Sequence, residues 1–357
     1  MPEFREARTT NSGGGRFFED FSLGEIIAHA TPRTITAGDV SLYTGLFGSR
    51  FAVQSSDVFA RAIGYPRAPV DDLLVFNMVF GKTVPDISLN AVANLGYANC
   101  RFPAPVYPGD TLSAASEVIG LKENSNGKTG IVYVRSRGFN QEGAEVLDYV
   151  RWVMVQKRSE KAKAPEAHVP KLPAAVDGSL LGSACPPLDR EGYDLTLAGS
   201  TRRYADYSVG EKIDHVDGVT IEDAEHQIAT RLYQNNARIH FNQFAAAQGR
   251  FGRRLVYGGH VISLARSLSF NGLGNAFHVA AINAGRHVAP VFAGATIFAW
   301  SEVLSKGEVR SREDVGAMRL RTIATQDQPC GKFPGKKGDE YHASVVLDLD
   351  YWVLIPR

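Results

Sequence analysis

The stretch "DFSLGEIIAH", residues 20–29, returns as "DYSVGEKIDH" at residues 206–215, and this repeat decides the fold. Six of the ten residues are identical, and the two stretches lie 186 positions apart. Self-similarity at a fixed spacing is the signature of an internal repeat. The first question is therefore how far the similarity extends along the 357 residues of the chain.

The similarity continues to the end of the chain. "PVYPGDT" (residues 105–111) matches "PVFAGAT" (290–296) at a spacing of 185, and "LDYVRWVMV" (147–155) matches "LDLDYWVLI" (347–355) at a spacing of 200. The extra residues fall around "QDQPCGKFPGKKGDE" (326–340), whose Gly, Pro and Lys content predicts a loop. The chain is therefore predicted to contain two copies of one fold.

Each copy has the same predicted order of elements. Helical segments near residues 37–47 and 221–234 come before one apolar helix, "VDDLLVFNMVFGKTV" (70–84) or "GGHVISLARSLSF" (258–270). The first of these helices is apolar nearly all round, as a helix enclosed by a sheet must be. β-rich runs follow, such as "GIVYVRSRGF" and "ASVVLDLDYWVLI", and "NQEGAE" (140–145) predicts a hairpin turn between two of them. We expect an α+β fold in which an antiparallel sheet curls around a helix, twice.

Composition also predicts the boundaries between the copies. The stretch at residues 157–187 is rich in Lys, Ala and Pro and has no sustained apolar period, so it predicts a linker. Residues 1–15 are predicted to be a disordered tail. The expected units are an N-terminal copy at 16–157, a linker at 158–187 and a C-terminal copy at 188–357.

The overall composition excludes several classes of partner. A formal net charge of +1 argues against general attraction to nucleic acid or to an anionic membrane. No apolar run is long enough to cross a bilayer, and the N-terminus lacks the apolar centre of a signal peptide. The three cysteines have neither metal nor disulfide spacing, which favours the reducing cytoplasm. We expect a cytoplasmic protein without membrane or nucleic-acid partners.

Two motifs resemble those of a known family. "RFPAPVYPGDTL" (101–112), followed by "GFNQEGAEVLDY" (138–149), resembles the strand signature of the MaoC-like dehydratases. "LYQNNARIHFNQFA" (232–245) occupies the place of that family's hydratase motif, roughly Leu-Thr-Gly-Asp-x-Asn-Pro-x-His-x-Asp. The resemblance covers nearly all of both copies and implies a double hot-dog fold, in which each antiparallel sheet wraps a central helix.

The resemblance implies candidate catalytic positions one residue at a time. The motif histidine falls on His240, and the motif aspartate falls on Asn235, a departure because an amide is neither base nor acid. The His-Gly that begins the family's central helix falls on Tyr257-Gly258, followed by Gly259. The family activity is reversible hydration of an α,β-unsaturated acyl-CoA. The whole chain, including "YTGLFGSRF" (43–51) and "APVDDLLVFNMVFG" (68–81), more closely resembles the members of this family that have mesaconyl-CoA as substrate and β-methylmalyl-CoA as product, which implies the same reaction here.

This reaction needs a base for water, a proton for the α-carbon and donors for the charge on the thioester oxygen. Because its ordinary pKa is near 6.5, His240 suits the proton transfers, and Asn235 would orient the water or the imidazole. Gly258 and Gly259 would offer backbone N–H groups at the positive end of a helix, with Tyr257 beside them. No metal or redox cofactor is required. Alternatively, His240 is a packed structural histidine, Asn235 a cap or turn residue and Tyr257 a packing residue.

The first copy lacks these groups. At the spacing of 186 it has Gln54 where the second copy has His240, Ser49 in place of Asn235, and Asp71-Asp72 in place of Tyr257-Gly258. Carboxylates at a helix start would repel a developing oxyanion. We therefore expect one active site per chain, with the first copy shaping the acyl-CoA pocket.

Mesaconyl-CoA carries a second carboxylate, so its pocket should contain a cation. Arginine can bind a carboxylate through two hydrogen bonds, and the sequence offers three candidates: Arg238, Arg286 and Arg50. Other functions remain open, namely an (R)-specific enoyl-CoA hydratase for simple acyl chains, a hot-dog thioesterase and a non-catalytic acyl-CoA binding module. Because hot-dog units usually pair, we expect a homodimer.

Overall fold

Two buried helices form the centres of the two copies in a computed structural model that describes residues 14–357, except for the side chain of Ser179. They are α4 (Asp72–Ile87) and α8 (Gly258–Leu268). Both lie where the apolar segments predicted them, and α4 is buried on nearly every side. Most of the predicted disordered tail lies outside the described residues.

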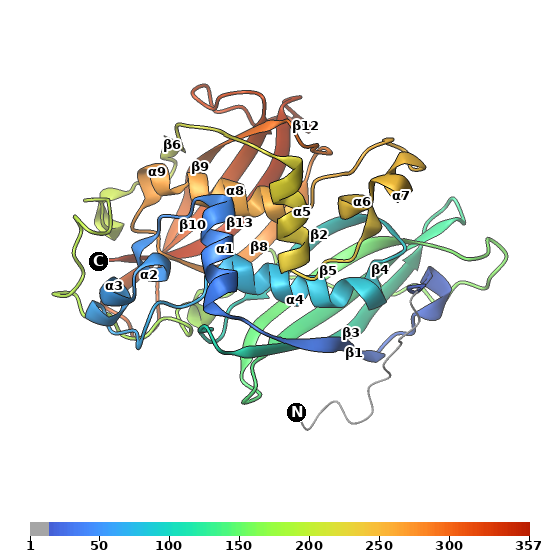
Figure 1. Ribbon diagram of the computed structural model, residues 1–357, viewed down its shortest axis with the longest axis horizontal. Helices are drawn as coiled ribbons and strands as arrows, with labels where there is room; N and C mark the ends of the chain where they lie inside the picture. The colour runs from blue at the N-terminus through green and yellow to red at the C-terminus, as the bar shows by residue number, and fades with distance from the viewer. Residues whose placement is uncertain (1–13) are drawn as a thin grey trace.

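A single antiparallel sheet, with strands of different lengths, runs through both copies (Figure 1). Its order is β1-β3-β4-β5-β2-β8-β13-β10-β9-β6, and β7 pairs with β9. The first copy supplies β1 (Ile26–Thr34), β2 (Ala91–Arg101), β3 (Thr111–Glu123), β4 (Thr129–Phe139) and β5 (Glu145–Gln156). The second supplies β6 (Lys212–Asp214), β7 (Val219–Thr220), β8 (His278–His287), β9 (Thr296–Glu308), β10 (Val315–Gln326) and β13 (Val345–Pro356).

The two copies meet at the pair β2 and β8. These strands are antiparallel, with Tyr97 opposite Gly285 and Arg101 opposite Ala281. Since β2 follows α4 and β8 follows α8, the junction pairs equivalent strands of the two copies. The α+β double hot-dog expected from the sequence is therefore confirmed, and the "NQEGAE" turn does connect β4 to β5.

The other helices are shorter, and the first of each copy lies in front of the central helices in Figure 1. In the first copy these are α1 (Ala37–Phe47), α2 (Ala52–Ser55) and α3 (Asp57–Ala62); in the second they are α5 (Asp223–Leu232), α6 (Arg238–Phe241), α7 (Gln243–Ala247) and α9 (Phe270–Leu273). Three 3-10 turns complete the helical elements of the described chain, at Phe18–Asp20, Gly178–Leu180 and Tyr204–Asp206. Within residues 14–357, the helices are too short or too polar to span a lipid bilayer.

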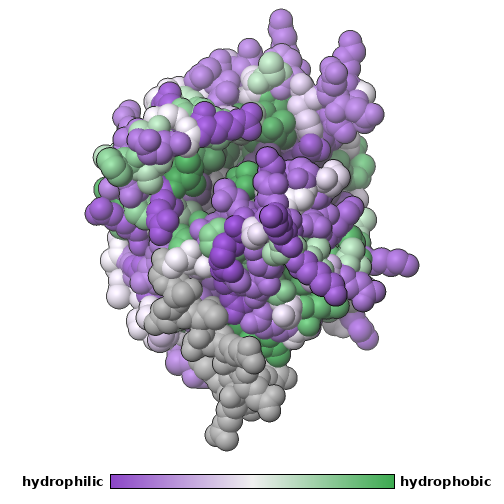
Figure 2. Space-filling model, turned by 90° about the vertical axis from the view of Figure 1, so that its right-hand side faces the viewer, coloured by the Kyte–Doolittle hydropathy of each residue, from purple (hydrophilic) through white to green (hydrophobic). Residues whose placement is uncertain are grey.

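The connecting segments agree with the loop predictions and add one detail. Residues 326–340 are mostly loop, with a small hairpin of β11 (Lys336–Lys337) and β12 (Glu340–Tyr341). The predicted linker has little regular structure, but Val176, Leu181 and Cys185 are buried in a hydrophobic cluster with β8 and β13 residues. The same cluster contains Phe59 and Tyr65 of the first copy, so the linker is packed against both copies. The face shown in Figure 2 is mostly hydrophilic, and hydrophobic residues lie around a hollow in its upper half.

Candidate active site

The turn between α5 and α6 includes Asn235 and packs directly on α4, and His240 follows on α6. Gly81 of α4 makes this contact possible, because a Cβ added there would lie 1.9 Å from the Tyr233 carbonyl oxygen and 3.3 Å from the Asn235 nitrogen. Gln234 between them has a positive φ of 54°, which turns the chain sharply. A helix of the first copy thus supports the motif of the second.

The imidazole of His240 has a defined hydrogen-bonding state. Its Nδ1 lies 2.8 Å from the Leu255 carbonyl oxygen, which can only accept, so Nδ1 carries the proton and Nε2 keeps a lone pair. Burial lowers the pKa of His240 to about 4, against the smaller opposing effect of the Leu255 hydrogen bond. At neutral pH the half-buried His240 is therefore an uncharged imidazole with a basic Nε2.

Asn235 holds the turn that leads to His240. Its Oδ1 accepts a hydrogen bond from the Ala237 N–H at 3.1 Å, and its own N–H donates to the Thr230 carbonyl at 2.9 Å. The side chain is 5% exposed. Its Nδ2 makes no hydrogen bond within residues 14–357, so the amide has a structural role and still has donor hydrogens available.

The start of α8 lies beside this turn. The Tyr257 N–H donates to Nε2 of His226 at 2.9 Å, and no side chain caps the following helix. Gly258 and Gly259 therefore provide the first N–H groups of α8, which have no partner in the helix itself. Since these groups and the helix dipole both favour negative charge, the site can bind an oxyanion.

The two glycines also allow close packing, which the sequence had not indicated. A Cβ added to Gly258 would lie 2.3 Å from Nε2 of His287, and one added to Gly259 would lie 2.1 Å from Oδ1 of Asn77. Any larger residue would displace these neighbours. His287 on β8 and Asn77 on α4 therefore belong to the surroundings of the helix start.

Neutral histidines surround His240. The ring centroid of His226 lies 6.3 Å from that of His240 and 5.3 Å from that of His260. Burial lowers the pKa of His226 to about 2, of His260 to about 3 and of His287 to about 4. Tyr257 completes the group, with its ring centroid 5.5 Å from that of His240. Around the candidate base, then, burial favours uncharged rings.

A comparison of the two copies could have identified these histidines. At the repeat spacings the first copy has Val40 for His226, Leu74 for His260 and Phe102 for His287. By contrast, His29 and His215 are equivalent and both bond a serine hydroxyl, Ser116 or Ser301, through Nε2. His226, His260 and His287, which gather near His240, therefore have no histidine counterpart in the first copy.

The equivalent position in the first copy is already occupied by its own side chains. Asp71 accepts a hydrogen bond from the Leu73 N–H at 2.9 Å, which caps α4. Asp72 accepts from the Val279 N–H at 2.8 Å and lies 2.9 Å from Nδ1 of His278. Gln54 donates to the Phe277 carbonyl at 2.7 Å. These contacts leave the start of α4 negatively charged and capped.

The three arginines proposed for a substrate carboxylate are exposed. Arg50 donates to Oδ1 of Asn271 at 2.6 Å, and Arg286 lies 5.6 Å from the centroid of the Tyr341 ring. Arg238 shares the short helix α6 with His240, but its side chain is at the surface. The structure brings none of these guanidinium groups into contact with the histidine cluster.

Comparison with known proteins supplies the context for this site. The profile of the mesaconyl-CoA hydratase family matches residues 4–339. The β-methylmalyl-CoA dehydratase of Chloroflexus aurantiacus is 62% identical over 96% of this chain and 97% of its own length. The mesaconyl-CoA hydratase of Cereibacter sphaeroides is 58% identical over 97% of this chain and 99% of its own.

Solved structures agree with the fold. A MaoC domain protein dehydratase from Chloroflexus aurantiacus superposes with a TM-score of 0.94 at 61% identity, covering 98% of this chain and 99% of the other. A Mycobacterium tuberculosis protein described as having a double hot-dog fold gives a TM-score of 0.74 at 24% identity, covering 96% and 99%. The second likeness concerns the fold alone.

Proposed function

The chain belongs to the mesaconyl-CoA hydratase family, and we propose that its single active site lies at the start of α8 with His240 as the base. It is a hydro-lyase that interconverts mesaconyl-CoA and β-methylmalyl-CoA. The observation that carries the site assignment is the hydrogen bond from His240 Nδ1 to the Leu255 carbonyl, because it leaves Nε2 free to accept a proton.

In the proposed mechanism, water gives a proton to Nε2 of His240 as its oxygen bonds to the β-carbon. The electron pair of the double bond moves toward the thioester oxygen and forms an enolate. The N–H groups of Gly258 and Gly259 stabilise this charge. The α-carbon then takes the proton from the imidazolium, which restores the neutral ring and completes the addition on one face.

The low pKa of His240 favours rapid passage of that proton. Burial makes the imidazolium unfavourable, so the charged ring forms only while the enolate is present to offset its charge. We propose that Asn235 orients the attacking water through Nδ2. Replacing it with Asp keeps the acceptor for Ala237 and removes this donor. We therefore expect lower turnover with unchanged thermal stability, and unchanged turnover would contradict the role.

The wild-type reaction is tested by following the absorbance of the unsaturated thioester. We expect mesaconyl-CoA to be hydrated with a higher kcat/KM than crotonyl-CoA, without release of free CoA thiol. Equal or greater activity on crotonyl-CoA would favour an (R)-specific hydratase of simple acyl chains. Release of thiol, detected with a thiol reagent, would favour a thioesterase.

We further propose that the enzyme is a cytoplasmic homodimer. The support is its three free buried cysteines, which suit a reducing compartment, together with the tendency of hot-dog units to pair. Analytical ultracentrifugation at micromolar concentration is expected to give twice the 38.8 kDa chain mass. A sedimenting species of one chain would contradict the proposed dimer.

A further inference from the structure

Arg151 on β5 is a buried arginine that forms no ion pair with a carboxylate of residues 14–357. Its side chain is 0% exposed. Nη2 donates to the Thr83 hydroxyl at 2.7 Å and Nη1 to the Ser88 hydroxyl at 3.4 Å, while Nε has no partner within residues 14–357. Both acceptors are neutral, so they do not balance the charge. A buried guanidinium in this state is strongly unfavourable without a counter-charge.

Other arginines on the sheet do have acidic partners. Arg135 binds Asp148 through Nε and Nη2 at 2.8 and 2.7 Å. In the second copy, Arg319 binds Asp350 in the same two-pronged way. These pairs are only partly buried, yet each is neutralised. Arg151 is more deeply buried than Arg135 or Arg319, and unlike them it has no carboxylate partner within residues 14–357.

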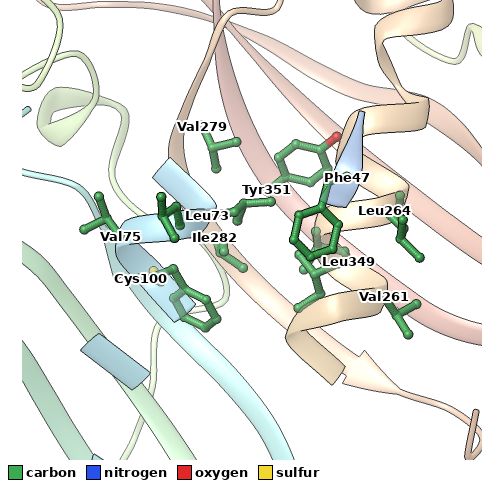
Figure 3. Close-up of a cluster of buried hydrophobic side chains, with 14 of the residues drawn as sticks. Phe47, Leu73, Val75, Cys100, Val261, Leu264, Val279, Ile282, Leu349 and Tyr351 are labelled. Carbon is green, nitrogen blue, oxygen red and sulfur yellow. The ribbon is translucent and has the colours of Figure 1, made fainter. Parts of the chain in front are cut away.

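The second copy shows what the fold itself requires at the equivalent position. A small cavity there is lined by Val279, Ile282, Leu349 and Tyr351, together with Leu73 of α4, and by Thr322 and the arginine Arg266 of α8. Figure 3 shows the first five of these side chains gathered in one apolar cluster. This copy therefore has an uncharged tyrosine at the sheet position of Arg151, and the arginine that lines its cavity, Arg266, comes from the helix and donates to the Ser269 hydroxyl and the Ala276 carbonyl.

The same four sheet positions of the first copy are polar. At the spacing of 185 they hold Asn94 and Tyr97, and at the spacing of 200 they hold Tyr149 and Arg151. Both side-chain amide atoms of Asn94 are buried without a hydrogen-bond partner in the described chain. The fold does not demand this change from apolar to polar, so a polar ligand is the simplest reason for it.

A continuous set of ring contacts joins Arg151 to the candidate base. Its guanidinium carbon lies 4.2 Å from the centroid of the Phe80 ring, and the Tyr257 ring lies 5.6 Å from the same ring. Tyr257 in turn lies 5.5 Å from His240, and its hydroxyl has no partner in the described chain. Arg151 therefore belongs to the interior behind His240, on the side of the first copy.

We propose that Arg151 binds the free carboxylate of the acyl group and so makes the enzyme specific for dicarboxylic thioesters. This inference rests on the proposed function. In mesaconyl-CoA the carboxylate is attached to the carbon that receives water, so it must lie close behind the reacting atoms. The guanidinium would then gain the counter-charge it lacks, and the first copy would supply the specificity of the second copy's site.

The test measures binding of two saturated thioesters that cannot be hydrated. Succinyl-CoA carries a terminal carboxylate, and butyryl-CoA has a methyl group there. Calorimetry on the full-length wild type, Arg151→Met and Arg151→Lys separates carboxylate recognition from binding of the shared CoA part. We expect Arg151→Met to lose about 100-fold or more in affinity for succinyl-CoA, with butyryl-CoA within about twofold of wild type.

Arg151→Lys decides the question if the methionine variant does not fold. It keeps the charge but not the fork of donors, so about a tenfold loss for succinyl-CoA alone is expected. Equal losses for both thioesters, or no loss for succinyl-CoA, in the variant that folds would overturn the proposal. Failure of the wild type to hydrate mesaconyl-CoA would instead contradict the proposed function, because the binding assay involves no turnover.

Discussion

At the scale of single residues, the environment of His240 decides what it can do. A histidine with an ordinary pKa near 6.5 would be partly charged at pH 7. His240 is held neutral by burial, and the Leu255 carbonyl selects the tautomer with a free Nε2. The missing acid at Asn235 is therefore compatible with chemistry, since the imidazole needs no second titrating group to be in the basic form.

This state predicts the pH dependence of the reaction. Because the pKa of His240 is about 4 in the folded enzyme, the basic form persists well below pH 6.5. We expect kcat/KM for mesaconyl-CoA hydration to stay level from pH 7 to about 5 and to fall near pH 4. Circular dichroism at each pH identifies the range in which the protein stays folded. An acidic limb near pH 6.5 in folded enzyme would contradict this account.

At the scale of elements, the two central helices have the same place and different starts. α4 begins with Asp71 and Asp72, which cap it and bind neighbouring groups, whereas α8 begins with two glycines and no cap. Burial and then the charge of Asp72 raise the pKa of Asp71 to about 6. One helix start is therefore built for stability, and the other leaves its donors available.

The contact between α4 and the catalytic turn can be tested at Gly81. An added methyl group would collide with the Tyr233 carbonyl, so Gly81→Ala should destabilise the protein by roughly 1–3 kcal/mol and reduce turnover. Gly45 on α1 is a matched control, because nothing lies within 4 Å of a Cβ added there. Gly45→Ala should leave activity unchanged and stabilise by up to about 1 kcal/mol. Urea unfolding and the hydration assay measure both effects; similar results for the two variants would argue against the close contact.

At the scale of the whole molecule, one sheet joins two copies that carry different residues at equivalent positions. The strand pair β2 and β8 fixes the copies edge to edge, so that α4 supports the motif of the second copy. The first copy lacks counterparts of the proposed catalytic groups and still contributes side chains to the shared interior. Gln54 and Asp72 form internal hydrogen bonds, and Arg151 stands where the second copy has Tyr351.

The buried histidines predict how the molecule responds to acid. Burial is the largest cause of the lowered pKa of each of these: His29, His215, His226, His240, His260 and His287. The unfolded chain binds protons near pH 6.5 that the folded chain does not, so stability falls as pH decreases below that value. Each group contributes up to about 1.4 kcal/mol per pH unit between its unfolded and folded pKa values. Urea unfolding at pH 7 and pH 5 should show a marked loss, and equal stability would contradict it.

The sequence predicted the fold well because the repeat and the apolar helices are local patterns. The core of α4 and the hairpin at residues 140–145 could be placed from composition alone. The sequence could not show which residues far apart along the chain lie close together in space. Sheet pairing and helix packing across the copies bring His226, His287 and Asn77 to the start of α8. The sequence alone does not contain this information, so it could not show that the three candidate arginines are exposed. A residue-by-residue comparison of the copies would have singled out Arg151, since its counterpart is Tyr351.

The most direct test of the central claim is a paired substitution in the two copies, assayed with mesaconyl-CoA. His240→Gln gives the second copy the residue of the first, and Gln54→Ala alters the equivalent position of the first copy. We expect His240→Gln to reduce kcat by about 10²–10⁴-fold while the protein stays folded, and Gln54→Ala to keep kcat within about twofold. Near-normal turnover of His240→Gln, or an equal loss in Gln54→Ala, would contradict a single active site centred on His240.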